Sequence, residues 1–82
     1  MSESRIELTI GMCVIALTKH IMKKNNLHQE EAYKKLLASE LYKVLKDPET
    51  RLLMETNDYL CEAYDEEVAN GVDAFYTYIN NN

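Results

Sequence analysis

The sequence has very few residues that interrupt regular backbone structure. Of its 82 residues, one is proline and two are glycine. Valine, threonine and phenylalanine are also too sparse to build several strands, whereas leucine, alanine, glutamate and lysine are plentiful and favour helix. These scarcities argue against a β-rich fold. They predict an all-α protein, a compact bundle of four to five helices that forms a single domain over residues 1–82.

Cysteine and sequence motifs that carry chemistry are scarce as well. The chain has only Cys13 and Cys61, fewer cysteines than a disulfide scaffold would use, and no CxxC or other close spacing of zinc ligands. It also has no glycine-rich phosphate loop and no HExxH or GxSxG motif. We therefore expect two reduced core cysteines, no metal or other cofactor, and no enzymatic activity.

Long hydrophobic runs and a basic charge balance are also missing. The longest apolar stretch, residues 10–17, is far shorter than the roughly 20 residues that a membrane-spanning helix needs. The first residues lack the cationic region and cleavage site of a secretory signal. A formal net charge of -5 gives no general attraction to phosphate backbones or anionic lipid. These features predict a cytoplasmic protein that binds neither nucleic acid nor membrane.

The first predicted helix is apolar on every side along its middle. Ser4, with Glu7 three residues later, has the spacing of a capping box and marks the helix start, and lysines near residues 23–25 suit its end. An amphipathic surface helix needs only one apolar stripe. Either the other helices surround this one, or its outer side is buried against a second copy of the chain. We favour a homodimer. The residues assigned to self-association are Ile10, Cys13, Val14 and Leu17.

The middle of the chain is predicted to form one long amphipathic helix. It starts with His28 at the cap position, and apolar residues recur at three- and four-residue steps along it. Ser39 is expected to kink this helix, and Asp47 and Pro48 are expected to end it. A short helical turn should follow through residues 52–53.

The last third is predicted to hold two more helices. A break is placed at residues 56–58, which are good caps. Asn70 and Gly71 supply the usual left-handed helix stop, after which Asp73 can cap a short final helix. The side chains expected to pack from these two helices are Leu60, Cys61, Tyr64, Val68, Val72, Phe75, Tyr76 and Ile79.

A second stripe on the helix after residue 57 is acidic. Helical spacing brings its carboxylates together on one face. A calcium loop would need a glycine turn and alternating oxygen ligands, which the segment lacks. We expect a solvated surface, with docking of a protein partner that has a basic surface as the functional alternative. The residues of this acidic face are Asp58, Glu62, Asp65 and Glu66.

Two other classes of function remain open. The chain has six tyrosines and no tryptophan, and a pocket between helices lined by tyrosine and cysteine would make it a small-molecule or metal-binding protein. A helix beginning near Gln29 also has a partly basic surface, which would suit an antitoxin-like regulator. The leading prediction is a small helical protein-interaction module that self-associates.

The stretches Tyr59–Cys61 and Asn70–Tyr76 resemble a group of short uncharacterised bacterial helical proteins. The resemblance covers most of the chain, but the matching positions are packing and capping patterns. It implies a bacterial origin and a helical fold, and it implies no activity. His28 departs from this pattern, in which a serine is expected at that cap.

Overall fold

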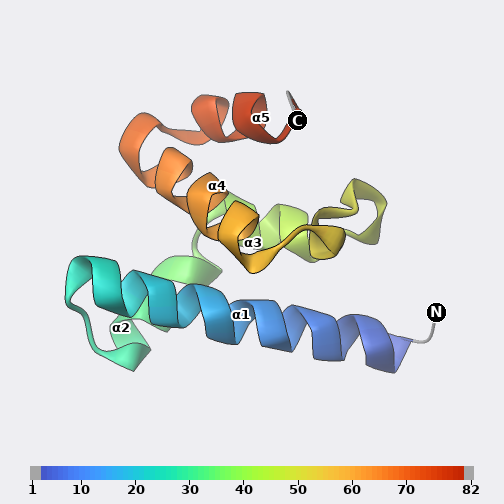
Figure 1. Cartoon of the computed structure of the whole chain (residues 1–82), viewed down its shortest axis with the longest axis horizontal. Helices are drawn as coiled ribbons and strands as arrows, with labels where there is room; N and C mark the ends of the chain where they lie inside the picture. Colours follow the sequence, from blue (N-terminus) through green and yellow to red (C-terminus); the bar gives the residue numbers. More distant parts are fainter. Residues whose placement is uncertain (1–2, 81–82) are drawn as a thin grey trace.

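The computed structural model describes residues 3–80, without the side chains of residues 3, 4 and 48. All of its elements are helical, so the predicted all-α bundle of four to five helices is confirmed (Figure 1). In chain order the elements are α1 (Glu3–Asn25), α2 (Gln29–Leu37), α3 (Glu40–Leu45), the 3-10 turns η1 (Pro48–Thr50) and η2 (Leu52–Met54), α4 (Asn57–Asn70) and α5 (Val72–Asn80).

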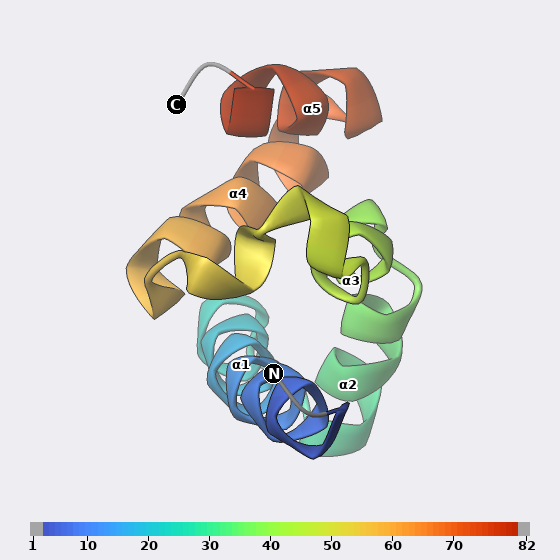
Figure 2. The same ribbon diagram turned by 90° about the vertical axis from the view of Figure 1, so that its right-hand side faces the viewer.

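The longest helix, α1, lies along one side of the molecule (Figure 1). The chain reverses after Asn25, and α2 packs against α1, while α4 packs on the same inner side of α1 from further along the chain. On the side of α4 away from α1, α5 completes the bundle (Figure 2). The alternative in which the other helices surround the first helix is therefore wrong, because they cover it from one side only.

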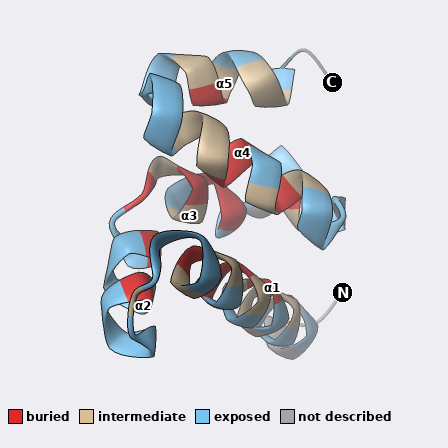
Figure 3. Cartoon of the chain, turned by 60° about the vertical axis from the view of Figure 1, so that its left-hand side comes forward, coloured by how far each residue is buried: buried red, intermediate tan, exposed pale blue. Residues whose placement is uncertain are grey.

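The core is built from one stripe of each helix. Figure 3 shows these buried residues facing the interior, while the outer faces of α1 and α2 are exposed. Fully buried large side chains come from every α-helix: Leu17, Ile21, Leu36, Leu41, Leu45, Leu60 and Phe75. Since burial of such a side chain contributes about 2 kcal/mol, this stripe accounts for much of the stability of so small a domain.

Two of the residues assigned to self-association belong to this core instead. Cys13 and Leu17 are 6% and 1% exposed within a single copy of the chain. They lie one turn apart and share a face with Ile21, because residues spaced by four recur on the same side of a helix. Their assignment to a contact between copies is therefore wrong.

Ser39 breaks the long helix that was predicted for the middle of the chain. Its hydroxyl donates to the carbonyl of Leu36 at 2.6 Å and accepts from the backbone N–H of Tyr42 at 3.2 Å. It therefore ends α2 and caps α3. The predicted kink is a complete break, because a serine with extended backbone offers the next helix a cap that a helical serine cannot.

The N-terminus of α3 has a second cap, which comes from a distant helix. The carboxylate of Glu67 in α4 accepts from the backbone N–H groups of Glu40 and Leu41 at 2.8 and 3.0 Å. The first N–H groups of a helix have no partner within that helix. Glu67 thus satisfies two of them and ties α3 to α4.

Predicted boundaries near the other helices are confirmed in part. Thr56 caps α4 by accepting from the N–H of Tyr59 at 3.1 Å, and His28 occupies the cap position of α2 without a side-chain hydrogen bond. The start of α1 is Glu3, one residue before Ser4. The capping hydrogen bond predicted for Ser4 lies outside the described side chains.

The turn between α4 and α5 differs from the prediction. Gly71 has φ 95° and ψ 176°, an extended conformation with positive φ rather than a left-handed helical one. Because α5 begins directly at Val72, Asp73 lies inside its first turn and is not the cap. Val68 and Val72 are 64% and 44% exposed, so their predicted burial is wrong. Both lie beside this sharp turn, where no other described element packs over them.

Candidate interaction surface and cavity

The outer face of α1 has an exposed apolar stripe. Leu8, Met12 and Ile15 are 66%, 63% and 58% exposed. Steps of four and three residues place them next to one another on one face of the helix. Single exposed apolar residues are common, but a row of three large ones on one helix is typical of a contact surface. None of the described helices is long and apolar enough to cross a membrane.

A groove between α1 and α2 continues this stripe. It has a volume of about 290 Å³, and Ile15 and Tyr33 stand on its two sides. Thr18 lines it with a hydroxyl that is buried and has no hydrogen-bond partner among the described residues. An unpartnered buried hydroxyl costs about 1–3 kcal/mol. Because Ile15 and Tyr33 stand on opposite sides of the groove, the exposed apolar surface extends from α1 across it to α2.

The residues that the sequence assigned to self-association coincide only in part with this exposed surface. Ile10 and Val14 are half-buried, and Val14 lines the groove, whereas Cys13 and Leu17 point into the core. The stripe residues Leu8, Met12 and Ile15 were missed. Their four–three spacing was visible, but nothing in an all-round apolar segment showed which side the other helices would cover.

The acidic face on α4 is largely engaged within the chain. Both oxygens of Asp65 lie 3.0 Å from Nε2 of His20, and one lies 2.9 Å from Nζ of Lys24. Asp65 is therefore a half-buried ion-pair partner of α1. Burial acts to raise the pKa of Asp65, but the hydrogen bonds from Lys24 and His20 outweigh it and lower this pKa below its ordinary value.

Two further carboxylates of this face also have partners. Glu62 accepts from the hydroxyl of Tyr78 at 2.8 Å, which raises the pKa of Tyr78 to about 12. Glu66 accepts from the side-chain amide of Asn70 at 2.9 Å. Asp58 alone of the four has no hydrogen bond or ion pair with the described part of the chain. Docking of a basic partner at this face remains a prediction. Because three of its four carboxylates have partners within the chain, the face offers less unpaired negative charge than the sequence suggested.

The Asp65 cluster predicts a pH-dependent stability. Because the pKa of Asp65 is lower in the folded chain than the value of about 3.9 in an unfolded one, its contribution is complete above that value and disappears as pH falls through the folded pKa. We expect Asp65→Asn to be less stable than the unmodified chain near neutral pH, and the difference to shrink steadily below pH of about 4. Urea unfolding at several pH values measures this. The control variant Glu66→Gln should differ from the unmodified chain much less in unfolding free energy. If the loss of stability in Asp65→Asn stays constant down to acid pH, Asp65 is not the ion-pair partner described here.

The two cysteines are placed for packing rather than reactivity. Burial raises the pKa of both thiols, and the carboxylates of Asp65 and Asp58 raise that of Cys61 further. A raised pKa leaves the thiol protonated and a poor nucleophile. His20 is the candidate base nearest to Cys13 in sequence, but its Nε2 is already hydrogen-bonded to Asp65.

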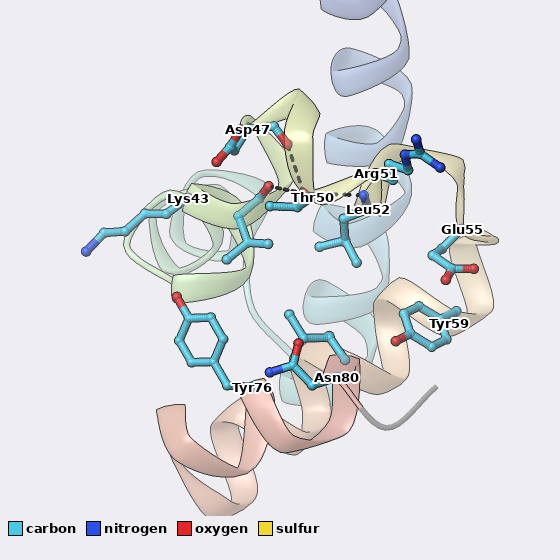
Figure 4. A pocket seen from close by; sticks show the side chains of 11 residues that line it. Lys43, Asp47, Thr50, Arg51, Leu52, Glu55, Tyr59, Tyr76 and Asn80 are labelled. Atoms are coloured by element: carbon cyan, nitrogen blue, oxygen red, sulfur yellow. Dashed lines mark hydrogen bonds between the residues drawn. The ribbon is translucent and has the colours of Figure 1, made fainter.

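A cavity with a volume of about 610 Å³ lies between the segment from α3 to η2 and the final helix α5 (Figure 4). Leu52 points into it, Tyr76 and Tyr59 stand on opposite sides, and Asn80 lies at the α5 wall. Tyr59 also packs on Tyr78, with ring centroids 5.3 Å apart. This cavity has the tyrosines that were predicted to line a pocket between helices. The predicted cysteine is not among its lining residues.

No family model, curated protein or solved structure matches the chain. The resemblance to short bacterial helical proteins therefore stays a prediction.

Proposed function

We propose that this protein is a small helical interaction module that associates with a second copy of itself through α1. The observation that carries the proposal is the exposed stripe of Leu8, Met12 and Ile15. A domain of this size buries only about two-thirds of its unfolded surface and has little stability in reserve. Covering three large apolar side chains therefore brings a substantial gain in free energy on association.

The order of charges along α1 supports an antiparallel pair of copies. Residues 3–7 contain two glutamates and one arginine, whereas residues 19–24 contain three lysines, of which Lys24 is already paired with Asp65. In an antiparallel pair the acidic start of each helix lies beside the basic end of the other. The two helix dipoles are then also opposed, which adds to the attraction. A parallel pair would place like charges together.

The size of the surface also suits a second copy. A helix of 23 residues is about 34 Å long, and the groove with Tyr33 widens the stripe on one side. Beside the stripe, a Cβ atom added to Gly11 would meet nothing within 4 Å, so a second helix can approach the backbone closely there. Such a strip can supply a substantial part of the roughly 800 Å² that each partner of a stable complex buries.

A charge placed in the stripe should abolish the association. We expect Met12→Asp to sediment as a monomer at concentrations where the unmodified chain is a dimer, because the interface would have to bury an unpaired carboxylate. Sedimentation equilibrium measures this difference.

Val68→Asp is the matched control for Met12→Asp. Val68 is 64% exposed, like Met12, but it lies on α4. This variant should remain a dimer. If both variants dimerise as the unmodified chain does, α1 is not the contact surface.

Both cysteines are free of disulfide bonds. This state suits a reducing compartment, and on that ground we propose a cytoplasmic location.

A further inference from the structure

The cavity bounded by η1, η2 and α5 has the dimensions and floor of a small-molecule site. Its volume of about 610 Å³ lies within the usual range of about 300–1,000 Å³ for ligand pockets. Val44 and Leu52, which line it, are 8% and 5% exposed, and Ile79 adds a third apolar side chain from α5. This floor can take an apolar group of a few carbon atoms.

Several polar groups around the cavity are already engaged. The hydroxyl of Thr50 donates to a backbone carbonyl and lies 3.3 Å from the N–H of Leu52. The hydroxyl of Tyr76 donates to Glu40 at 2.5 Å, and the same carboxylate lies 3.7 Å from Nζ of Lys43. These groups shape the walls and have little capacity left for a ligand.

Three other lining groups make no hydrogen bond or ion pair with the part of the chain that the structure describes. They are the guanidinium of Arg51, the amide of Asn80 and the carboxylate of Glu55. Arg51 and Glu55 lie on the same side of the opening, and Asn80 lies on the α5 wall (Figure 4). Two hydrogen-bond donors and one anionic acceptor thus surround an apolar floor.

Arg51 also occupies an unfavourable backbone conformation. Its φ of 57° and ψ of 16° are left-handed helical, a region that glycine adopts readily and residues with a Cβ atom avoid. Glycine would suit the turn between η1 and η2 better.

We infer that this cavity binds a free α-amino acid with an apolar side chain. The carboxylate of the ligand pairs with Arg51, whose planar guanidinium suits bidentate binding. The ammonium group pairs with Glu55, and the side chain lies on the floor of Val44, Leu52 and Ile79. A zwitterion fits better than a simple anion because the two charged lining groups without a partner in the described part of the chain, Arg51 and Glu55, are of opposite sign.

Titration with L-leucine and L-phenylalanine, followed by amide chemical shifts, tests this inference. We expect a Kd of about 1 mM or tighter for at least one of them, with shifts concentrated in residues 44–55 and 76–80. 4-Methylpentanoate and 3-methylbutylamine, which resemble leucine without the ammonium or the carboxylate, should bind at least about tenfold more weakly, because each leaves one charged group unpaired. Absence of binding by both amino acids, or equal binding of the three leucine-like compounds, would overturn the inference.

The variant Arg51→Gly separates ligand binding from folding. It should raise the melting temperature of the free protein by a few degrees, because glycine relieves the strained backbone, and it should bind the amino acid at least about tenfold more weakly. Arg51→Lys keeps the charge and should bind with intermediate affinity. If Arg51→Gly binds as tightly as the unmodified chain, the arginine is not the carboxylate partner. This result is independent of self-association, which the Met12→Asp variant tests at another surface.

Discussion

Replacing Leu17 with alanine is expected to lower the free energy of unfolding by about 3 kcal/mol, because the change leaves a cavity in the core. The side chain is 1% exposed and lies among the fully buried residues that α1 contributes. For a domain of this size, such a loss is a large fraction of the total stability. Urea unfolding followed by circular dichroism at low protein concentration measures it.

Met12→Ala is the control for Leu17→Ala, because both residues lie on α1 but on different faces. Met12 is 63% exposed, so its truncation should change the stability of the single chain by less than about 0.5 kcal/mol. It should weaken self-association instead. Equal unfolding midpoints for Leu17→Ala and the unmodified chain would show that the buried face of α1 has been assigned incorrectly.

Replacing Glu67 with alanine is expected to lower the free energy of unfolding by about 3 kcal/mol. The carboxylate accepts two hydrogen bonds from the first N–H groups of α3, at 2.8 and 3.0 Å. Its removal leaves both donors without their partner, and each unsatisfied donor costs about 1–3 kcal/mol where water cannot replace it. The helix dipole of α3 loses a compensating negative charge as well. Thermal or urea unfolding gives the change directly.

Glu67→Gln and Glu66→Ala are the matched variants for this cap. Glutamine keeps an acceptor oxygen without the charge, so Glu67→Gln should lose less stability than Glu67→Ala. Glu66 directly precedes Glu67 and, among the described residues, accepts only from the exposed Asn70, so Glu66→Ala should lose less than about 0.5 kcal/mol. A Glu67→Ala variant as stable as Glu66→Ala would mean that water replaces the carboxylate and that the cap contributes little.

Local sequence signals were sufficient for several helix boundaries. Thr56 caps α4 and His28 occupies the cap of α2, because extended backbone before a helix depends on the residues next to it. Ser39 has the same kind of local signal, but the periodic apolar pattern on both sides of it masked the break. The capping signal prevailed over the apolar periodicity because the buried Ser39 hydroxyl bonds to the end of α2 and to the start of α3.

Contacts between distant residues could not be predicted from spacing. Glu67 caps α3 from 26 residues away, and Asp65 reaches His20 across 45. In the sequence both acids belong to an ordinary charged helix. Only the packing of α4 between α1 and α3 gives them partners, and Asp65, which was predicted to be solvated, ties α4 to α1.

The face of α1 that contacts the core was ambiguous for a different reason. A helix that is apolar on every side has no period from which its orientation could be deduced. Packing of α2 and α4 buries Cys13 and Leu17 and leaves Met12 and Ile15 outside. The excess of apolar residues was the useful signal, because it predicted that some of them would remain exposed in a single copy.

Light scattering across a wide concentration range tests the self-association of this chain most directly. An exposed stripe on α1 predicts a species of twice the 9.5 kDa chain mass, which dissociates on dilution. A mass of 9.5 kDa at every concentration up to the highest that stays in solution would contradict it.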